Sequence, residues 1–589
     1  MMRPYRIALT AIVAFALAAG FAATAHGATG NPLTPGAQLY VDPASTTVEA
    51  AATLTGADQS NALLLAQYPT ATWFTGGTPR EVADDAATLV GSAKAAGQVP
   101  VIVAYNLPNR DCGQYSAGGA QSLADYKAWI AGLATGIDGG PAVVILEPDG
   151  LGLIPNYTDS DGGGGNCTIA GADPADRFAA LTYAVDTLKT GANTSVYLDA
   201  THSGWQNVGA AAQRLLKAGV RNADGFFLNA SNYQWTVNQV FYGTWVSGCI
   251  ALAEADSPAD PAAWDAPRNC RNQYWNGGPA TSWQGTGMDN LVEWKDVPFA
   301  DPANPTADEI ASLAWNTVGI DSQYASDLAA AKASASTHFV IDTSRNGQGP
   351  WDWAGAGYAN AGAAQDWCNP PDRGIGLVPT TDTGNTLVDA YLWLKVPGES
   401  DGTCSRGSAD GTDAAWSGIT DPIAGGWFPQ QAAQLISLAN PALTRLAPSI
   451  PLILGTPEVG QAVTANPGTW SPAGVTFTYQ WLLDGAPIGG ATAGTYIIAA
   501  TDAGHALRVT VTGALTGYTG TSLTSAAVTP VAAPAPTPTP TPTPSGNGAG
   551  VPTGGSVAGS DRPAGLAFLL LAGAGVVLLA PVSWRRRTV

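Results

Sequence analysis

The chain has 589 residues, which at ~150 residues per domain allows about four units, or fewer if one of them is a barrel. Its 45 acidic and 25 basic residues give a formal net charge of −20, which argues against nucleic acid and anionic membrane surfaces as partners. The chain has four histidines and no Cys-x-x-Cys spacing, which argues against zinc sites and Ser-His-Asp triads. The 19 tryptophans supply flat aromatic surfaces, which suit the faces of sugars as well as an ordinary core.

The N-terminus has the pattern of an export signal. After Arg6 the residues are almost entirely apolar as far as an alanine-rich stretch at 25–28, so we expect residues 1–28 to be a secretory signal peptide. Export favours disulfides among the six cysteines, and pairing in chain order is the simplest arrangement. The expected bridges are Cys112–Cys167, Cys249–Cys270 and Cys368–Cys404.

Residues 31–446 alternate short apolar runs with alanine-rich stretches. The apolar runs that we expect to be strands are 70–74, 99–105, 142–147, 195–199, 225–228, 338–342 and 390–395. Such alternation predicts an α/β fold, a distorted parallel β/α barrel of about seven strands. Functional side chains are then expected at the carboxyl ends of the strands.

Residues 450–530 have a different pattern, in which short alternating strands such as 507–511 are separated by turn residues. This pattern predicts a small all-β sandwich after the barrel. The segments 455–460 and 479–485 resemble bacterial immunoglobulin-like (Ig-like) modules, and we expect Trp481 in the core of the sandwich.

The C-terminal residues predict attachment to the cell surface. Alternating proline and threonine within a linker at 531–562 indicate a stiff polyproline-type spacer. Residues 563–584 carry no charge and precede a basic tail at 585–589, as expected for a transmembrane anchor with a cytoplasmic tail. The alternative is a sortase-type sorting signal, faintly present at 551–554. Both routes place the protein outside the cell.

Acidic residues follow two of the predicted strands. After the apolar run 99–103 a turn carries Asp111 beside Cys112, and the run 143–146 is followed by Glu-Pro-Asp-Gly at 147–150. Two carboxylates that meet in one site cannot easily both ionise, so one is driven toward the protonated form that donates a proton near neutral pH. The alternative for either aspartate is a turn former or a helix cap.

Seven segments in chain order carry a family pattern, among them Tyr-Asn-Leu-Pro-Asn-Arg-Asp-Cys and Leu-Glu-Pro-Asp-Gly. They are 105–112, 146–150, 197–205, 228–233, 339–347, 366–368 and 393–402. This series resembles glycoside hydrolase family 6, the inverting cellulases, over about residues 31–446. The resemblance implies hydrolysis of β-1,4-glucosidic bonds in cellulose or another uncharged β-glucan, by an endoglucanase or a cellobiohydrolase, with no metal and no organic cofactor. We also expect a monomer.

The resemblance implies roles in catalysis. Asp149 matches the general acid that protonates the leaving glycosidic oxygen, and Asp111 matches the residue that raises the pKa of that acid. Tyr105 matches the tyrosine that crowds and distorts the sugar ring. Asp401 matches the proposed catalytic base, and a water chain that ends at Asp111 is the competing proposal. An inverting site leaves room for water, with the acid and base carboxyls ~6.5–9.5 Å apart.

The resemblance also implies substrate-binding residues. The expected stacking platforms are Trp73, Trp205 and Trp367. The residues expected to hold sugar hydroxyls are Asp199, His202, Asn232, Lys395 and Glu399. Ser116 is the candidate for holding the water. Two alternatives stand beside these roles, since Trp73 can be a core residue and His202 can cap a loop.

The sequence leaves two alternatives open for the shape of the active site, for the role of an insert and for the function. The 38-residue spacing from Asp111 to Asp149 resembles the open cleft of endoglucanases, whereas the 26 residues from Asp401 to Trp427 resemble the lid of a cellobiohydrolase tunnel. A tryptophan-rich insert at 244–305 either roofs the groove or is a structural excursion far from the sugar. The alternative function is a non-catalytic polysaccharide-binding adhesin, against which the three retained aspartates argue.

Overall fold

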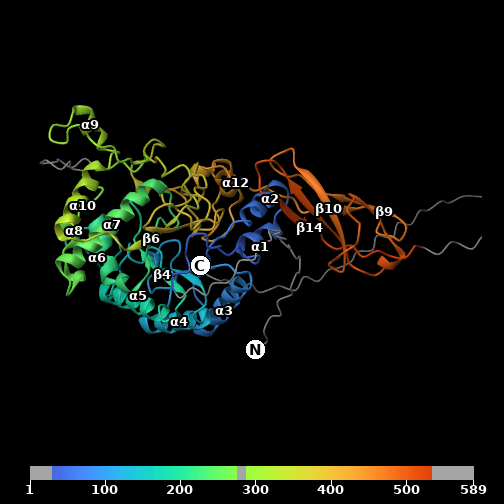
Figure 1. Cartoon of the computed structure of the whole chain (residues 1–589), viewed down its shortest axis with the longest axis horizontal. Coiled ribbons are helices and arrows are strands. Elements are labelled where there is room, and N and C mark those ends of the chain that lie inside the picture. Colours follow the sequence, from blue (N-terminus) through green and yellow to red (C-terminus); the bar gives the residue numbers. More distant parts are fainter. Residues whose placement is uncertain (1–29, 166, 275–286, 534–589) are drawn as a thin grey trace, which may run out of the picture.

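The computed structural model describes residues 30–533 except residue 166 and residues 275–286 (Figure 1). Its centre is a seven-stranded sheet in which each strand pairs in parallel with the next strand of the chain. The strands are β1 (Thr72–Phe74), β2 (Val101–Ala104), β3 (Ala142–Leu146), β4 (Thr194–Asp199), β5 (Gly225–Leu228), β6 (His338–Asp342) and β7 (Val388–Leu392). All seven predicted strands are confirmed, with small shifts at their ends.

Both faces of this sheet are buried. Successive side chains of a strand point to opposite faces, and Ile102 and Val144 accordingly pack outward with the helices. Their neighbours Val103 and Ile145 pack inward with the other strands. All four side chains are fully buried. Burial on both faces explains why the strands appear in the sequence as continuous apolar runs.

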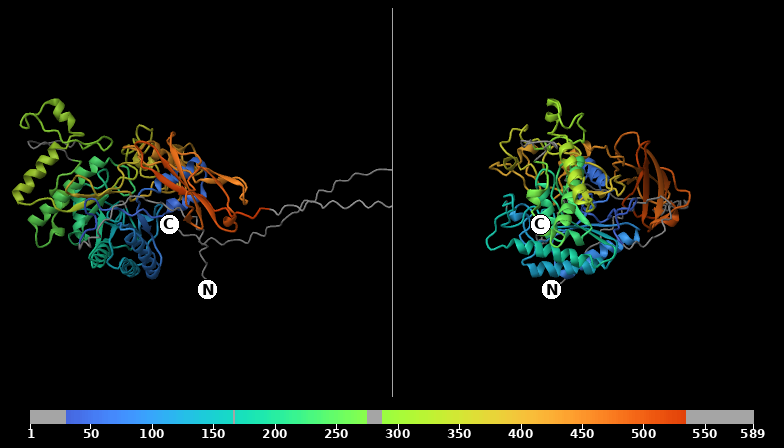
Figure 2. Two further views of the ribbon diagram at one scale, coloured as in Figure 1. Left: turned by 45° about the vertical axis from the view of Figure 1, so that its right-hand side comes forward. Right: turned by 60° about the vertical axis from the view of Figure 1, so that its left-hand side comes forward.

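Helices cover the outer face of the sheet (Figures 1 and 2). The longer ones are α3 (Pro79–Ala95), α4 (Leu123–Ile137), α5 (Pro174–Leu188), α6 (Val208–Lys217), α7 (Thr236–Asp256) and α10 (Val318–Ala331). Chain neighbours among them pack together, as α3 does with α4 and α6 with α7. Local sequence sets where they begin, since Thr78 and Glu81 form a capping box before α3 and Asp173 caps α5.

The remaining helices are mostly short. They are α1 (Thr46–Thr53), α2 (Gly56–Leu65), α8 (Ala266–Asn269), α9 (Ala307–Ser312), α11 (Ala361–Ala364) and α12 (Pro429–Ser437). The 3-10 turns are η1 (Asp111–Gly113), η2 (Val220–Asn222), η3 (Pro261–Ala263), η4 (Ala414–Trp416) and η5 (Ala500–Asp502). Among the described residues, none of the helices is long and apolar enough to cross a membrane.

The barrel is incomplete between β1 and β7, which are the two end strands of the sheet. Two hydrogen bonds bridge the gap. The backbone N–H of Ala71 donates to the carbonyl of Trp393 at 3.0 Å, and Nε1 of Trp73 donates to the carbonyl of Leu394 at 2.8 Å. The curled sheet matches the prediction of a distorted barrel, and its parallel strands all present their carboxyl ends at the same side.

The three predicted disulfides are confirmed. The Cα atoms are 5.6 Å apart in Cys112–Cys167, 5.8 Å in Cys249–Cys270 and 6.0 Å in Cys368–Cys404. The first bridge fastens the loop after β2, and the third fastens the segment after β6 to the segment after β7. Two of the three bridges therefore hold loops at the carboxyl ends of the strands.

The insert at 244–305 does not roof the groove with its described tryptophans. Its first residues belong to α7, and Trp245 and Trp294 stack in the core at 5.6 Å, each with 1% of its surface exposed. Trp264 packs against the same core. Large aromatic side chains gain most from full burial, which the composition cannot distinguish from exposure to sugar. Trp275 and Trp283 lie outside the described residues.

A β-sandwich follows the barrel, as predicted. One sheet has the order β11-β10-β13-β14 and the other has the order β12-β9-β8. The strands are β8 (Leu452–Leu454), β9 (Ala462–Asn466), β10 (Thr476–Leu483), β11 (Ala486–Pro487), β12 (Thr495–Ile497), β13 (Leu507–Ala514) and β14 (Thr521–Thr524). Trp481 is fully buried in its core with Val509 and Val511, so the predicted place of this tryptophan is confirmed.

The predicted signal peptide at 1–28 and the predicted anchor at 563–584 lie outside the described residues, as do most of the linker and the basic tail.

Candidate active site

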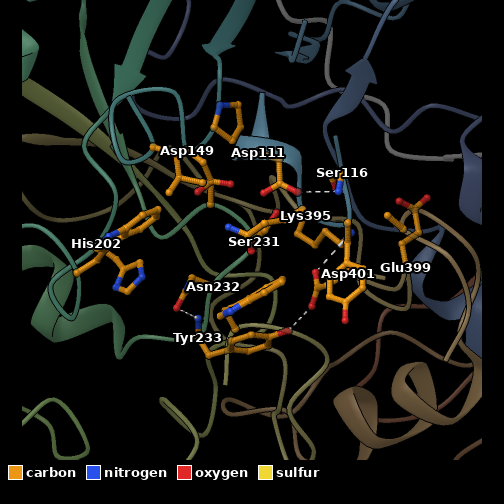
Figure 3. A pocket seen from close by; sticks show the side chains of 18 of the residues that line it. Asp111, Ser116, Asp149, His202, Ser231, Asn232, Tyr233, Lys395, Glu399 and Asp401 are labelled. Atoms are coloured by element: carbon orange, nitrogen blue, oxygen red, sulfur yellow. Dashed lines mark hydrogen bonds and ion pairs between the residues drawn. The ribbon is translucent and has the colours of Figure 1, made fainter. Parts of the chain in front are cut away.

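A pocket of about 540 Å³ opens at the carboxyl ends of the strands (Figure 3). All the catalytic and binding residues predicted from the sequence line this pocket, except Asp199. The lining residues among them are Trp73, Tyr105, Asp111, Ser116, Asp149, His202, Trp205, Asn232, Trp367, Lys395, Glu399 and Asp401. They come from the ends of all seven strands. The parallel topology thus gathers residues that are far apart in the sequence.

Asp149 lies in the turn that follows β3. Its backbone has a φ of 62°, and its carbonyl accepts a hydrogen bond from the N–H of Leu153 at 2.8 Å, so the turn is fixed. Burial raises the pKa of Asp149 well above its usual range, and the charges of Asp199, Asp111 and Asp401 raise it further. This shift favours the protonated form of the side chain, which is the state that a general acid requires.

Asp199 is the predicted binding residue that the pocket does not include. It is 3% exposed. Its Oδ2 accepts hydrogen bonds from the N–H groups of Leu151 at 3.1 Å and Gly152 at 3.3 Å, and its Oδ1 accepts from Thr201 at 2.8 Å. The structure does not bring Asp199 to the pocket with the other predicted binding residues, because three backbone N–H groups hold its carboxylate. Asp199 instead fixes the loop after Asp149 and raises the pKa of that acid.

Asp111 lies at the start of η1 and lines the pocket. Its Oδ2 accepts a hydrogen bond from the backbone N–H of Ser116 at 2.7 Å (Figure 3). Burial raises the pKa of Asp111 to about 6, although the Ser116 N–H and the Arg110 charge oppose the shift. Ser116 was predicted to help hold the water, and its backbone N–H has this additional role. Asp111 therefore changes charge in the pH range in which the site would work.

Asp401 is held in its ionised form. Its Oδ2 accepts hydrogen bonds from Arg345 at 2.9 Å, Tyr233 at 2.8 Å and the N–H of Asn369 at 3.0 Å. Its Oδ1 lies 3.7 Å from the Lys395 ammonium. Burial alone would raise the pKa of Asp401, but the charges of Arg345 and Lys395 outweigh it and the pKa is lowered. Asp401 therefore has a weak affinity for protons.

Aromatic rings are spread along the pocket. Trp73 packs edge-on against Tyr105 at 5.5 Å, and both line the pocket, so Trp73 is not solely a core residue. Trp367 packs against Tyr115 at 5.7 Å. Trp205 lies beside His202 at 5.8 Å. Flat apolar faces at several points of a groove are what stacking on successive sugar rings requires.

The polar residues of the pocket are partly occupied by the protein. Nδ1 of His202 accepts a hydrogen bond from the N–H of Gly204 at 3.2 Å, and burial lowers its pKa to about 3, so the ring is neutral and caps its own loop while lining the pocket. The Lys395 ammonium donates to the carbonyl of Ser400 at 3.0 Å. Oδ1 of Asn232 accepts from the N–H of Tyr233 at 2.9 Å. All three residues line the pocket.

Arg110 and Arg345 are functional residues that the sequence analysis did not single out. The Arg110 guanidinium donates to the carbonyls of Thr75, Tyr105 and Ser116 at 2.8, 2.6 and 2.8 Å, and so joins the loops after β1 and β2. Arg345 neutralises Asp401. The sequence could have pointed to both arginines, since they lie in the segments 105–112 and 339–347 that carry the family pattern.

The insert also supports the pocket from outside. Nε2 of Gln273, which is fully buried, donates to the carbonyls of Ser203 at 2.7 Å and Gln206 at 2.9 Å. The hydroxyl of Tyr274 donates to the carbonyl of Trp205 at 3.1 Å. These contacts hold the loop that presents the Trp205 ring.

Glu147 is a fully buried carboxyl that joins the loops after β2 and β3. It accepts hydrogen bonds from the N–H of Asn106 at 2.9 Å and of Leu107 at 3.0 Å. Burial raises the pKa of Glu147 to about 7, although these hydrogen bonds and the Arg177 charge oppose the shift. Because Tyr105 immediately precedes Asn106 and Asp149 lies two residues after Glu147, these contacts connect the two segments that carry Tyr105 and Asp149.

Glu147→Gln is expected to flatten the pH dependence of stability. A folded-state pKa of about 7, above the ordinary 4.5, means that the stabilisation is complete below about pH 4.5 and is lost as the pH rises through about 7. At ~1.4 kcal/mol per pKa unit the loss is about 3 kcal/mol by pH 8. Urea unfolding of wild type and variant at pH 5 and pH 8 measures it. A difference between the two proteins that is the same at both pH values would contradict this prediction.

Comparisons with known proteins identify the family of the chain. The sequence profile of glycosyl hydrolases family 6 matches residues 34–254 and 265–439. The chain is similar to endoglucanase A of Thermobispora bispora, at 30% identity over 68% of this chain and 66% of that protein. It is also similar to endoglucanase 1 of Streptomyces halstedii, at 32% identity over 69% of this chain and 94% of that protein. A solved endoglucanase Cel6 from Mycobacterium tuberculosis, bound to a thio-linked cello-oligosaccharide, is 31% identical, with a TM-score of 0.45, over 70% of this chain and 100% of its own.

Proposed function

Because the chain belongs to glycosyl hydrolases family 6, we propose that it hydrolyses β-1,4-glucosidic bonds of cellulose or a related β-glucan with inversion at the anomeric carbon. The observation that carries the proposal is one pocket in which a protonated Asp149 and an ionised Asp401 lie among aromatic rings. An uncharged sugar chain suits aromatic platforms, and a carboxyl that favours its protonated form, in a pocket with further carboxylates such as Asp111, suits inverting hydrolysis. The relatives from Thermobispora bispora and Streptomyces halstedii are endoglucanases, which favours cleavage at internal bonds of the glucan.

Asp149 acts first in the proposed reaction. Its carboxyl proton passes to the glycosidic oxygen while the bond from that oxygen to the anomeric carbon breaks. Tyr105, which is 5% exposed, lies against Trp73 at the same wall of the pocket. A sugar ring that stacks there and meets Tyr105 is pushed away from its relaxed chair, which assists an oxocarbenium-like transition state.

We assign the acceptor of the water proton to Asp111 rather than to Asp401. A water molecule attacks the anomeric carbon from the opposite face and loses a proton as the new bond forms. An effective base has a pKa near the working pH, and burial raises that of Asp111 to about 6. Asp401 is already neutralised by Arg345 and Lys395. Its proposed role is electrostatic, to keep these two cations from lowering the pKa of Asp149.

The proposal also covers location and domain layout. A signal peptide at 1–28 would export the chain, and the segment at 563–584 would tether it to the cell surface with residues 585–589 inside. The catalytic region at 31–446 would then be held outside the membrane by the Ig-like sandwich at 450–530 and the linker at 531–562. Polysaccharides too large to enter a cell are substrates that such a layout can reach.

Hydrolysis of cellotetraose, with the products followed by NMR, tests the proposed function. We expect the newly formed reducing ends to appear first as the α-anomer, because water enters opposite to the leaving β-linkage. On soluble carboxymethylcellulose, a rapid loss of viscosity with few new reducing ends is expected from internal cleavage. Release of β-anomers would exclude inversion. Binding without any cleavage would establish the adhesin alternative instead.

A further inference from the structure

The β-sandwich rests on the catalytic region through an apolar contact. Leu523 of β14 is 1% exposed and packs with Ala51 of α1 and with Ala62 and Leu63 of α2. Figure 1 shows the orange sandwich beside these two blue helices. The N–H of Thr519 also donates to the carbonyl of Thr444 at 2.8 Å. A module that served only as a spacer would not need to bury apolar side chains against its neighbour.

Trp427 joins this contact to the pocket. Its ring packs against the same apolar cluster as Leu523. It also covers Gly398, where an added Cβ would lie 2.8 Å from Cη2 of the ring and where φ is 92°, so this position requires glycine. The backbones of Trp427 and Glu399 form a β-bridge. The ring of Trp427 therefore lies between the sandwich and the segment that carries Glu399.

Helix α1 makes a second connection to the same residue. The hydroxyl of Thr46, the first residue of α1, donates to Oε1 of Glu399 at 2.5 Å, and both residues line the pocket. Ala51 of the same helix lies under Leu523. Glu399 is thus held from two sides, by Thr46 of α1 and by the backbone of Trp427. Both α1 and the Trp427 ring contact the sandwich.

We propose that the β-sandwich buttresses the substrate groove, because through Leu523 it fixes α1 and Trp427 and thereby orients the Glu399 carboxylate toward the sugar. The inference rests on the proposed function, which supplies the ligand of Glu399. A carboxylate that is already in place loses less conformational freedom when a sugar hydroxyl binds to it. Leu523 is accordingly a positioning residue, which acts on the substrate only through Glu399.

Leu523→Ala in the full chain tests the inference with cellotetraose as substrate. We expect KM to rise about three- to tenfold with kcat changed less than about twofold, since the change affects orientation of a binding group and not proton transfer. The matched control is Leu507→Ala, which removes an equally buried leucine from the core of the same sandwich, away from this contact. An unchanged KM in the control, with a raised KM in Leu523→Ala, supports the inference. Equal effects in both variants would overturn it.

A double-mutant cycle with Glu399→Ala separates positioning from general destabilisation. If Leu523 acts through Glu399, its replacement raises KM in the wild-type background and has no further effect in Glu399→Ala. Effects that add fully in the double variant would overturn the inference. Should Leu523→Ala not fold, Leu523→Val, which shortens the same apolar contact without removing it, is used in the same cycle. Failure of the proposed function is distinct, since wild type would then not cleave cellotetraose at all.

Discussion

Asp149→Asn is expected to lower kcat on cellotetraose by ~10²- to 10⁴-fold, the contribution typical of a general acid. Asparagine has the same shape but no acidic proton, so the structure should be retained while the leaving oxygen departs unprotonated. Burial and three neighbouring carboxylates raise the pKa of Asp149 and so favour its protonated form. Steady-state kinetics at pH 6 measures the effect.

Two controls show whether the loss arises from proton donation. A dinitrophenyl cellobioside has a leaving group that needs no proton, so Asp149→Asn should cleave it with a much smaller loss. Asp199→Asn removes a charge that raises the pKa of Asp149, so the alkaline limb of the pH profile should move to lower pH. An equal loss of rate on both substrates would contradict the assignment of Asp149 as the acid.

The strands could be predicted because the sheet is buried on both faces. Residues such as Val103 and Val144 face opposite sides and are both fully buried, which leaves a continuous apolar run in the sequence. Polar residues directly after such runs then had to lie at the carboxyl edge of the sheet. This reasoning places Asp111 and Asp149 in one pocket without any knowledge of side-chain contacts.

Side-chain direction is what the sequence could not supply. Asp199 ends the apolar strand β4 and Asp149 follows the apolar strand β3, yet Asp149 lines the pocket while three backbone N–H groups hold Asp199. The tryptophans of the insert pose the same problem, since Trp245 is as apolar as a sugar platform but faces the core. The contact of Leu523 with α1 depends on how two independently predicted domains dock, which no local pattern encodes.

Asp401→Ala is expected to destabilise the fold by about 3–5 kcal/mol, the cost of removing one partner of a buried ion pair. The side chain of Arg345 is 0% exposed and that of Asp401 is 9% exposed, so the guanidinium would lose its carboxylate partner away from water and keep only its hydrogen bond to the carbonyl of Ser231. The Lys395 ammonium would lose its neighbouring carboxylate too. Urea unfolding at pH 7 measures the loss, and Asp111→Ala, which leaves the pair with Arg345 intact, is the matched control. A loss under about 1 kcal/mol would mean that solvent reaches Arg345.

The same two variants identify the proton acceptor. Azide attacks an anomeric carbon without having to lose a proton, so it restores activity only where the missing group was a base. We expect azide to restore Asp111→Ala, whose wild-type carboxyl has a pKa raised to about 6 by burial. It should not restore Asp401→Ala, because three hydrogen bonds and two cations already occupy that carboxylate in the wild type. Rescue of Asp401→Ala alone would reverse the assignment, and the role of Asp111 would then be limited to raising the pKa of Asp149.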